Sequence, residues 1–482
     1  MKIQLAQLDL LRPWPTLTLR EGYHAIRILV RVGTVPIGEV MTRPKRCPTV
    51  LPNRLSRRIV RRLTPALLRH LSRCALAAGP EAIAKLPPLP GRYVGSGSTW
   101  KSAARTLLKQ ILLPGGLSEP WRTICAQSQG EDRFECPPIT VAVCTRDRPQ
   151  ELQQCIEHLL KLDYPEFEIL ICDNSKDPAA TRKIAEQYDV AYTRAPIAGL
   201  SRARNVALAA AEHRWVAFTD DDCRPEPNWL RELARELQDT HCRCVTGLVL
   251  PAQLENSAEI TFEIYGGLGR GYAPLVFDPT YPRAHRWAPA KTWLIGAGAN
   301  MLLDRELVRE LGGFDPDMGP GGVGGCGEDT LVFYQLLKSG CNIHYTPRAI
   351  VHHFHRSSDE ALRKQIYSYA VGHAAYHVRC FWSYRDHRSL LQLIYHLPRW
   401  FARNFRRGIG ARTKYPFSLV PLEAKGTFAG AVRYPAVKVR RFLESLFKQK
   451  TAAYKTPPGP RIVSDRPKDY DATSVKKSFR AA

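Results

Sequence analysis

Three consecutive aspartates close a short apolar run that begins at Trp215 and is typical of a buried strand. Adjacent negative charges repel one another, and a divalent cation or a set of backbone donors among them would relieve that repulsion. Because side chains alternate in direction along an extended chain, Asp220 and Asp222 can converge on one site while Asp221 points away. Carboxylate oxygens suit Mg²⁺ or Mn²⁺. The triplet alone leaves a second reading open, in which the aspartates merely cap a helix around 228–237.

A second acidic pair, Glu328 and Asp329, follows a glycine-rich loop at 319–327 and stands at the start of an expected helix at 330–338. Two acids at a helix N-terminus interact favourably with the helix dipole, which would explain their charge without any chemistry. It would not explain the flexible glycines in front of them. The pair is therefore a candidate for acid–base chemistry.

Three histidines, His352, His353 and His355, follow a strand-like stretch at 348–351. Histidines two apart in an extended chain share a face, so His353 and His355 can converge. One of them could complete a metal shell or contact a diphosphate, and satisfied structural histidines are the alternative. The spacing does not choose between His353 and His355 as the ligand.

From Ile139 onward strands alternate with helices, which predicts an α/β fold with a doubly wound sheet and right-handed crossovers. The expected strands are 139–144, 167–172, 190–193 and the run from Trp215, with helices at 149–161, 179–188 and after Gly199. Polar residues fall at the strand ends, namely Thr145, Arg146, Asp173, Asp220 and Asp222. Since the carboxyl ends of such strands border one crevice, a nucleotide pocket explains these residues better than separate turn and helix caps.

The 482-residue chain has an ordinary globular composition, 44% hydrophobic and 24% charged. Its 70 Lys and Arg against 45 Asp and Glu give a formal charge of +25, which favours an acidic partner: nucleic acid, an anionic bilayer or a phosphate-bearing substrate. No apolar run of about 18 residues predicts a spanning helix, and the polar start is unlike a signal peptide, so we expect a cytoplasmic protein. The 13 scattered cysteines, without a C-x-x-C pair, predict reduced core thiols.

Composition and periodicity divide the chain into five expected regions. An alternating run at 25–32 and an extended piece at 35–41 predict a hairpin, and leucine spacing predicts a basic helix at 53–77 that Pro65 kinks. Segments rich in Pro, Gly and Ser flank one further helix at 100–112 and are typical of linkers. The regions are a hairpin-plus-helix region (1–78), a linker with one helix (79–138), the α/β domain (139–358), a basic helical extension (359–449) and a disordered tail (450–482).

The helical extension combines Trp, Phe and Leu with Arg and Lys in segments at 359–382, 390–407 and 420–447. Such a basic, partly amphipathic face can lie in a bilayer interface beside an anionic leaflet. It can equally pack on the α/β domain, and the sequence leaves the two open.

In their order along the chain, the motifs at 139–356 resemble a family-2 glycosyltransferase of the GT-A fold. The matching pieces are VAVCTRDRP from Val141, ILICDNS from Ile169, GLSRARNVAL from Gly199, FTDDDCRPEPNWL from Phe218, GAGANMLL from Gly296, GGFDPDMG from Gly312, GEDTLVFYQLLKSG from Gly327 and PRAIVHHFHR from Pro347. The resemblance implies a mixed α/β sheet and an inverting, metal-dependent transfer of a sugar from a nucleotide sugar, a UDP-sugar in our reading, to a glycan or lipid-linked acceptor. It says little about residues 1–130 or those beyond 385.

The resemblance also implies roles for particular residues. The nucleotide-sugar site would comprise Thr145, Arg146, Asp173, Gly199, Arg202, Arg204, Asn205 and Asp220. Asp173 can accept a base N–H or a ribose hydroxyl, and the loop-to-helix junction at 199–205 can offer free backbone donors. The arginines there could instead only brace the aspartate loop. Asp222, with Asp220 and His353, would hold Mn²⁺ or Mg²⁺.

Inverting sugar transfer is an in-line displacement in which the acceptor hydroxyl loses a proton as it attacks. In the family this base is an acid of the Glu-Asp pair, which implies Asp329 as the base and Glu328 as its positioning partner. A basic surface also suggests a rival, a nucleic-acid-binding protein. No base-reading module is recognisable, so we expect no specific nucleic-acid partner. A peripheral position on the inner face of a membrane is the further expectation.

Overall fold

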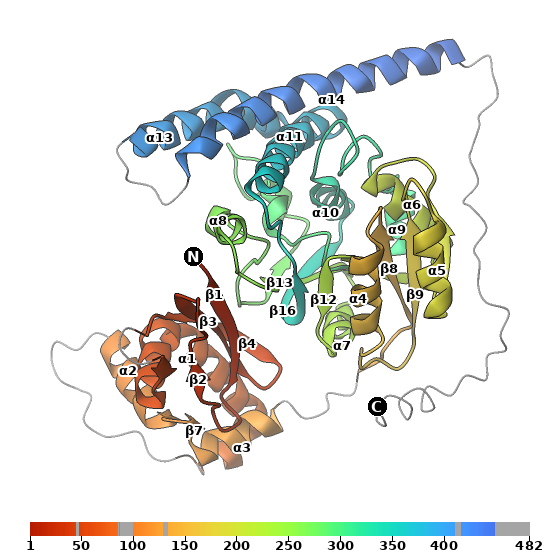
Figure 1. The fold of residues 1–482 in the computed structure, drawn as a ribbon. Coiled ribbons are helices and arrows are strands. Elements are labelled where there is room, and N and C mark those ends of the chain that lie inside the picture. Colours follow the sequence, from red (N-terminus) through yellow and green to blue (C-terminus); the bar gives the residue numbers. More distant parts are fainter. Residues whose placement is uncertain (45–47, 85, 87–99, 129–133, 410–415, 449–482) are drawn as a thin grey trace.

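The structure is a computed structural model that describes residues 1–44, 48–84, 86, 100–128, 134–409 and 416–448. A three-stranded sheet in the N-terminal region and a nine-stranded central sheet organise the chain, and long helices lie beyond the central sheet (Figure 1). The expected disordered tail at 450–482 lies outside the described residues.

The central sheet is mixed, which confirms the predicted α/β class. Its strands, in spatial order, are β10 (Ala191–Arg194), β9 (Phe167–Asp173), β8 (Ile139–Thr145), β11 (Trp215–Asp220), β15 (Met301–Asp304), β13 (Cys242–Pro251), β16 (Asn342–His353) and β12 (Cys223–Pro225), with β14 (Leu275–Phe277) on β16. The first four are parallel, whereas β15 runs antiparallel between β11 and β13. All strands foreseen from the alternating pattern are present.

Two hydrophobic cores cover the faces of this sheet. Strand β8 is buried along its whole length, and its alternation sends Ile139, Val141 and Val143 into one core and Ala142 and Cys144 into the other. Helices from both sides complete these cores: α4 (Pro149–Leu159), α5 (Ala179–Gln187) and α7 (Trp229–Arg235) on one side, α6 (Leu200–Ala210), α9 (Arg305–Glu310) and α10 (Glu328–Lys338) on the other. This arrangement is the predicted doubly wound layering.

The strand register brings the predicted polar residues to one edge of the sheet. Thr145 at the end of β8 pairs with Asp173 on β9, and Cys144 pairs with Asp220 on β11. At the other end of the strand order, β12 pairs with β16, and Cys223 lies opposite His353. Residues more than a hundred positions apart in the chain therefore meet at the carboxyl ends of the central strands.

The N-terminal region contains the predicted hairpin, formed by β3 (Ala25–Val32) and β4 (Val35–Thr42). A strand that the sequence did not predict, β1 (Ile3–Asp9), pairs parallel with β3. The basic helix α1 (Pro52–Ala84) is longer than expected, and its non-helical residue is Gly79 rather than a kink at Pro65. Two short ladders, β2 (Leu17–Thr18) with β5 (Thr49–Val50) and β6 (Leu112–Leu113) with β7 (Gly116–Leu117), complete the region.

The helix predicted at 100–112 is confirmed, but the linker prediction is wrong for the described residues 114–128. Helices α2 (Trp100–Ile111) and α3 (Glu119–Gln127) send Leu108, Ile111 and Ile124 into the same core as Ile59 and Leu67 of α1. Burial of these side chains outweighs the turn-forming composition around them. The segment therefore belongs to the N-terminal region.

The N-terminal region packs against the central sheet through its own strands. Leu29 on β3 lies in a cluster with Leu248, Leu250 and Ile350. The backbone amide of Ile3 donates to the carbonyl of Leu254 at 2.8 Å. These contacts join the two sheets directly.

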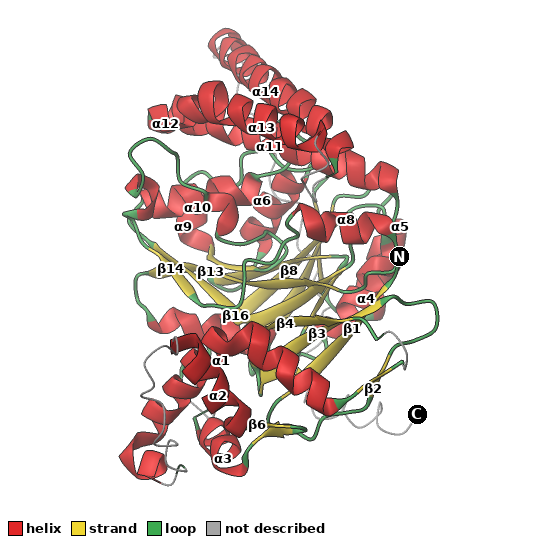
Figure 2. Ribbon diagram, turned by 90° about the vertical axis from the view of Figure 1, so that its left-hand side faces the viewer, coloured by secondary structure: helices red, strands yellow, loops and turns green. Residues whose placement is uncertain are grey.

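The helical extension lies on the side of the central sheet opposite α1 and α2, as Figure 2 shows. It comprises α11 (Asp359–Tyr384), α12 (His387–Leu391), a π-helical turn (Gln392–His396), α13 (Leu397–Ile409) and α14 (Val420–Lys448). Helix α14 packs on α11, and Lys438 contacts Asp315 and Asp317 at 2.8 Å each. Within the described residues, no helix is long and apolar enough to cross a membrane.

Candidate active site

The aspartate triplet and the histidine loop meet at the carboxyl edge of the sheet. Asp220, Asp222, Cys223 and His353 each place a possible ligand atom within 4.8 Å of the others. The Oδ1 atom of Asp222 is 3.3 Å from His353 Nε2 and, among the described residues, is a buried oxygen without a hydrogen-bond partner. Two carboxylates, one of them with this free oxygen, and an imidazole fit a divalent cation such as Mn²⁺ or Mg²⁺.

The alternation ends at Asp220, because Asp221 and Asp222 lie in a turn and both contact Arg148 Nη1 at 3.1 Å. Asp221 therefore does not point away from Asp222. It accepts hydrogen bonds from Thr145 Oγ1 at 2.8 Å and from Arg148 Nη1 at 3.1 Å. The competing explanation, that the aspartates cap the next helix, is wrong. Helix α7 begins only at Trp229, and its N-cap, Asn228, makes no side-chain cap hydrogen bond.

Burial and charged neighbours shift the pKa values of the cluster residues in different directions. Burial works against ionisation of Asp222, but His353, Arg356 and Arg148 together lower its pKa below the ordinary value. Burial, with help from Asp222, raises the pKa of Asp221 to about 6. Burial also lowers the pKa of His353 and raises that of Cys223. A neutral imidazole can donate a lone pair to a metal. A protonated thiol does not bind a hard cation, so the carboxylate oxygens remain as its other ligands.

A relay of side chains supports His353 from behind. Its Nδ1 lies 3.0 Å from His355 Nδ1, and His355 Nε2 lies 3.0 Å from Glu263 Oε1 on α8 (Ser257–Tyr265). Glu263 in turn accepts a 2.6 Å hydrogen bond from Arg27 on β3 of the N-terminal region. The two histidines do converge, and His353 is the one that faces Asp222. Outer partners of this kind fix the orientation of a ligating imidazole.

The Glu-Asp pair lies across the cavity and is joined to the aspartates by one arginine. Arg204, almost fully buried on α6, contacts Glu328 Oε1 at 2.7 Å and Asp220 Oδ1 at 3.4 Å. Its guanidinium also lies over the rings of Phe218 and Phe314. Burial raises the pKa of Glu328 to about 7, although Arg204 works in the opposite direction. The expectation that arginines brace the aspartate loop therefore describes Arg204 well.

Asp329 is held by backbone donors and keeps part of its surface open. Its Oδ2 accepts from the amide of Gly298 at 2.7 Å, and its Oδ1 accepts from the amide of Thr330 at 2.7 Å. Gly327, the N-cap of α10, has a φ of 103°, which strains any other residue. Asp329 Oδ1 also accepts from Thr330 Oγ1 at 3.3 Å, whereas the described residues give Oδ2 one hydrogen bond. Because each carboxylate oxygen has two acceptor positions, Oδ2 can still accept a hydrogen bond from another donor.

One cavity of about 2210 Å³ contains both acid centres. Of the predicted residues, it is lined by Thr145, Arg146, Arg204, Asp220, Asp222, Glu328, Asp329 and His353. Four others are not among its lining residues: Asp173, Gly199, Arg202 and Asn205. Asp173 is fully buried. Its Oδ2 accepts a 2.8 Å hydrogen bond from the Tyr192 hydroxyl and lies 3.1 Å from Arg194 Nη1.

The first two backbone amides at the start of α6 are already hydrogen-bonded within the protein. The amide of Gly199 donates to Asn174 Oδ1 at 2.8 Å, and that of Leu200 donates to the carbonyl of Pro320 at 2.9 Å. Arg202 donates to the carbonyl of Pro316, and Asn205 exchanges two 2.8 Å hydrogen bonds with the backbone of Phe314. This helix start therefore holds the loop before the Glu-Asp pair.

Sequence reasoning missed several residues that line the cavity. Arg148 and Asn174 lie inside quoted motifs, and Arg356 directly follows the histidines, so position alone could have suggested them. The wall formed by α13 carried no such signal. It contributes Arg399, Trp400, Arg403 and Arg406 to the same cavity.

The central region is similar to a known protein family. Residues 140–312 match the family model described as Glycosyl transferase family 2. The matched stretch includes the aspartate triplet. The acid pair and His353 lie beyond the matched stretch.

Individual relatives share this region at low identity. The succinoglycan biosynthesis protein ExoM of Rhizobium meliloti (strain 1021) is 28% identical over 44% of this chain and 66% of its own length. The O-antigen biosynthesis protein RfbC of Myxococcus xanthus is 26% identical over 59% of this chain and 23% of its own length. The pre-mycofactocin glycosyltransferase of Mycobacterium tuberculosis (strain CDC 1551 / Oshkosh) is 25% identical over 48% of this chain and 46% of its own length. The chain thus spans less than two thirds of each relative's length.

A similar solved structure is the mannosyltransferase PcManGT from Pyrobaculum calidifontis in complex with GDP-Man and Mn²⁺. It is 19% identical, with a TM-score of 0.44, over 62% of this chain and 88% of that one.

Proposed function

We propose that this chain is an inverting, divalent-metal-dependent glycosyltransferase. It would move a sugar from a nucleoside-diphosphate sugar, with UDP-sugars as the first candidates, to a hydroxyl of a glycan or lipid-linked acceptor during polysaccharide or surface-glycan synthesis. The observation that carries the proposal is one cavity that holds a cation-binding cluster and, across Arg204, a carboxylate with free acceptor positions.

On the donor side, Asp220, Asp222 and His353 would hold Mn²⁺ or Mg²⁺. When bound, the cation supplies Lewis-acid neutralisation of the diphosphate that leaves. Arg148 and Arg356 both contact Asp222 and line the cavity, so their remaining donors can face the phosphates. Arg146 lines the same cavity and is the nucleotide contact that we favour over Asp173.

On the acceptor side, Asp329 would take the proton of the attacking hydroxyl. The amides of Gly298 and Thr330 fix the carboxylate in place before the acceptor arrives. Glu328 would position the pair through its contact with Arg204 rather than touch the acceptor. The arginines of α13 complete a basic wall of the cavity and suit an anionic group on the acceptor or its carrier.

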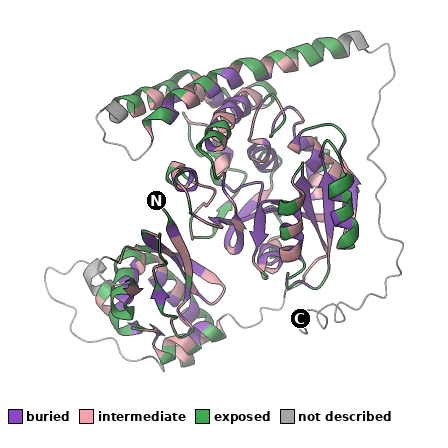
Figure 3. Ribbon diagram, viewed as in Figure 1, coloured by how far each residue is buried: buried purple, intermediate pink, exposed green. Residues whose placement is uncertain are grey.

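Helix α14 supports a position on an anionic membrane surface. It packs on α11 through Ala429 and Tyr434, which are buried. Its outer side is exposed over most of its length (Figure 3) and carries the apolar residues Phe428, Val432, Val439 and Leu443 beside Lys425, Arg433 and Arg440. Apolar and basic residues on one face are typical of a helix that lies in a bilayer interface. A cytoplasmic, peripheral enzyme stays our prediction.

A screen of donor hydrolysis across nucleotide sugars, with Mn²⁺ and with excess chelator, tests the proposal. We expect one donor class to be hydrolysed with metal and none with chelator. Equal hydrolysis in chelator would contradict metal dependence. Salt-sensitive binding of DNA or RNA, without any nucleotide-sugar binding, would favour the rival class instead.

A further inference from the structure

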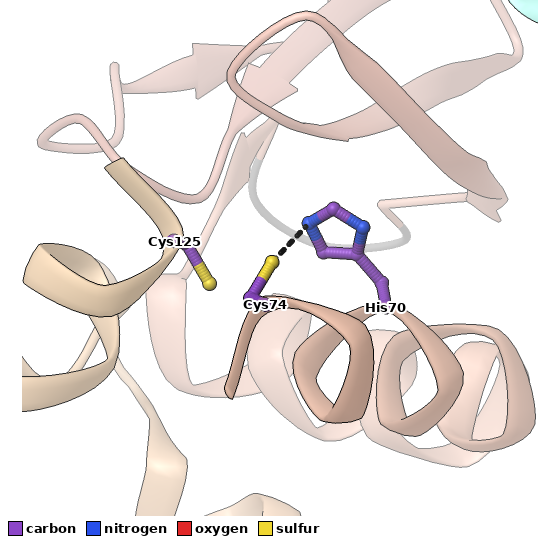
Figure 4. A group of neighbouring side chains, drawn as sticks. All are labelled: His70, Cys74 and Cys125. Atoms are coloured by element: carbon purple, nitrogen blue, oxygen red, sulfur yellow. Dashed lines mark hydrogen bonds between the residues drawn. The ribbon is translucent and has the colours of Figure 1, made fainter. Parts of the chain in front are cut away.

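The N-terminal region contains a second cluster of metal-ligating side chains, away from the cavity. His70 and Cys74 stand one helical turn apart on α1, and Cys125 faces them from α3, as Figure 4 shows. None of the three lines the cavity of the acid centres. The mechanism proposed above gives them no role.

The geometry of the cluster matches a tetrahedral zinc ion. The three ligand atoms lie within 4.8 Å of one another, and Cys74 Sγ is 3.4 Å from His70 Nε2. Zinc bonds of about 2.3 Å to sulfur and about 2.0 Å to nitrogen, at tetrahedral angles, place the two ligand atoms about 3.5 Å apart. The His70 to Cys74 spacing already has this value.

The chemistry of the donor set separates this cluster from the acid centre. Two thiols and an imidazole are the ligands that Zn²⁺ prefers, whereas Mg²⁺ and Mn²⁺ prefer oxygen. Both cysteines are buried and neither forms a disulfide, while His70 is only partly buried. A water molecule that reaches the cluster from that side would be the fourth ligand.

We propose that His70, Cys74 and Cys125 form a zinc site that fastens α3 to α1. The two helices otherwise meet through apolar contacts such as Ile124. Metal binding of this kind contributes directly to the stability of the fold.

Cobalt titration of the metal-free, reduced, full-length protein tests the site. Co²⁺ bound by thiolates gives a sulfur-to-metal charge-transfer band in the near ultraviolet, which carboxylate and imidazole ligands do not give. We expect this band with one equivalent of Co²⁺, its displacement by Zn²⁺, and a higher melting temperature of the wild-type protein with Zn²⁺.

Matched variants locate the band. Cys125→Ser should lose it, whereas Asp222→Asn and Cys341→Ser, a partly exposed cysteine outside the cluster, should keep it. The wild-type titration decides the question even if Cys125→Ser does not fold. Absence of the band in the wild type at saturating Co²⁺, or its persistence in folded Cys125→Ser, would overturn the proposal. A Cys74–Cys125 disulfide in protein kept under reductant would overturn it as well.

Discussion

The aspartate cluster at 220–222 and the acid pair at 328–329 share one cavity but hold their negative charge in different ways. In the cluster, Asp222 is surrounded by His353, Arg148 and Arg356, its pKa is lowered, and one of its oxygens still has no hydrogen-bond partner among the described residues. In the pair, burial raises the pKa of Glu328 to about 7. Asp222 therefore stays ionised with a free ligand atom, whereas Glu328 can exchange a proton near neutral pH.

The difference suggests that one centre holds a cation and the other handles a proton. Arg204 contacts both, at 3.4 Å to Asp220 and 2.7 Å to Glu328, so it fixes the distance between them. Variants at Asp222, Asp329 and Glu263 each change one centre and leave the other intact.

Asp222→Asn should have the largest effect, because it removes the charge and a ligand atom of the cation cluster. We expect transfer to fall to the level of the chelated enzyme and Mn²⁺-dependent donor binding to weaken, while the melting temperature changes little. Activity assays and Mn²⁺ titration followed by electron paramagnetic resonance measure both. Asp163→Asn, an exposed aspartate, is the matched control. Full activity of a folded Asp222→Asn enzyme would remove the cation from the model.

Asp329→Asn should lower turnover by roughly 10²–10⁴ with little change in donor affinity, because a general base acts on the acceptor alone. Single-turnover rates and donor binding measured on the same preparation separate the two quantities. Glu328→Gln keeps the shape of the residue that contacts Arg204 and should be milder. A large loss of donor affinity with near-normal turnover for Asp329→Asn would assign this residue to the nucleotide side.

The two centres also differ in how far the sequence predicted them. Asp220, Asp222 and Glu328 lie in short motifs at strand or helix ends, and local alternation and capping rules describe such positions well. Asp173, Arg202 and Asn205 lie in equally suggestive motifs but have partners elsewhere, and Asn205 binds the backbone of Phe314, more than a hundred residues away. Only the folded chain shows which polar side chains are already occupied.

The fold shows the same limit. The strongly alternating run at 25–32 predicted its strand, whereas β1 pairs with β3 across a long connection and has a weaker pattern, IQLAQLD. Likewise, proline and glycine around α2 and α3 suggested a linker, because composition does not report that Leu108 and Ile124 are buried against α1. Non-local burial decided both cases.

Glu263→Gln should have a smaller effect, confined to the cation centre, because it weakens the relay behind His353. Loss of an outer partner of a ligating histidine typically costs 10–100-fold in metal affinity. We expect the Mn²⁺ dissociation constant to rise by about that factor, with turnover recovered at saturating Mn²⁺. Glu255→Gln is the control, since Glu255 contacts Tyr23 at the same interface but no histidine. Equal effects of both variants would mean that the interface, not the relay, matters.

The smallest change should be a loss of membrane attachment without loss of chemistry. Replacing Arg433 and Arg440 on α14 by Glu reverses two charges on its outer face, and each basic residue near an anionic surface contributes on the order of 1 kcal/mol. We expect the wild type to co-sediment with anionic but not neutral vesicles at low salt. Attachment should weaken as salt shortens the Debye length below about 10 Å. The α14 variant should stay in solution while it hydrolyses donor normally.

Replacing Arg403 and Arg406 by Glu gives the matched charge change on the wall of the cavity. This variant should still bind vesicles but use its acceptor poorly, because α13 lines the space in front of the acid pair. If vesicle binding is lost in the α13 variant and kept in the α14 variant, the basic wall itself contacts the bilayer, and the cavity opens onto the membrane. Vesicle binding could also stay the same in both variants and at high salt. In that case charge on these helices does not attach the protein to the membrane. The role of α14 would then be to hold Asp315 and Asp317 through Lys438.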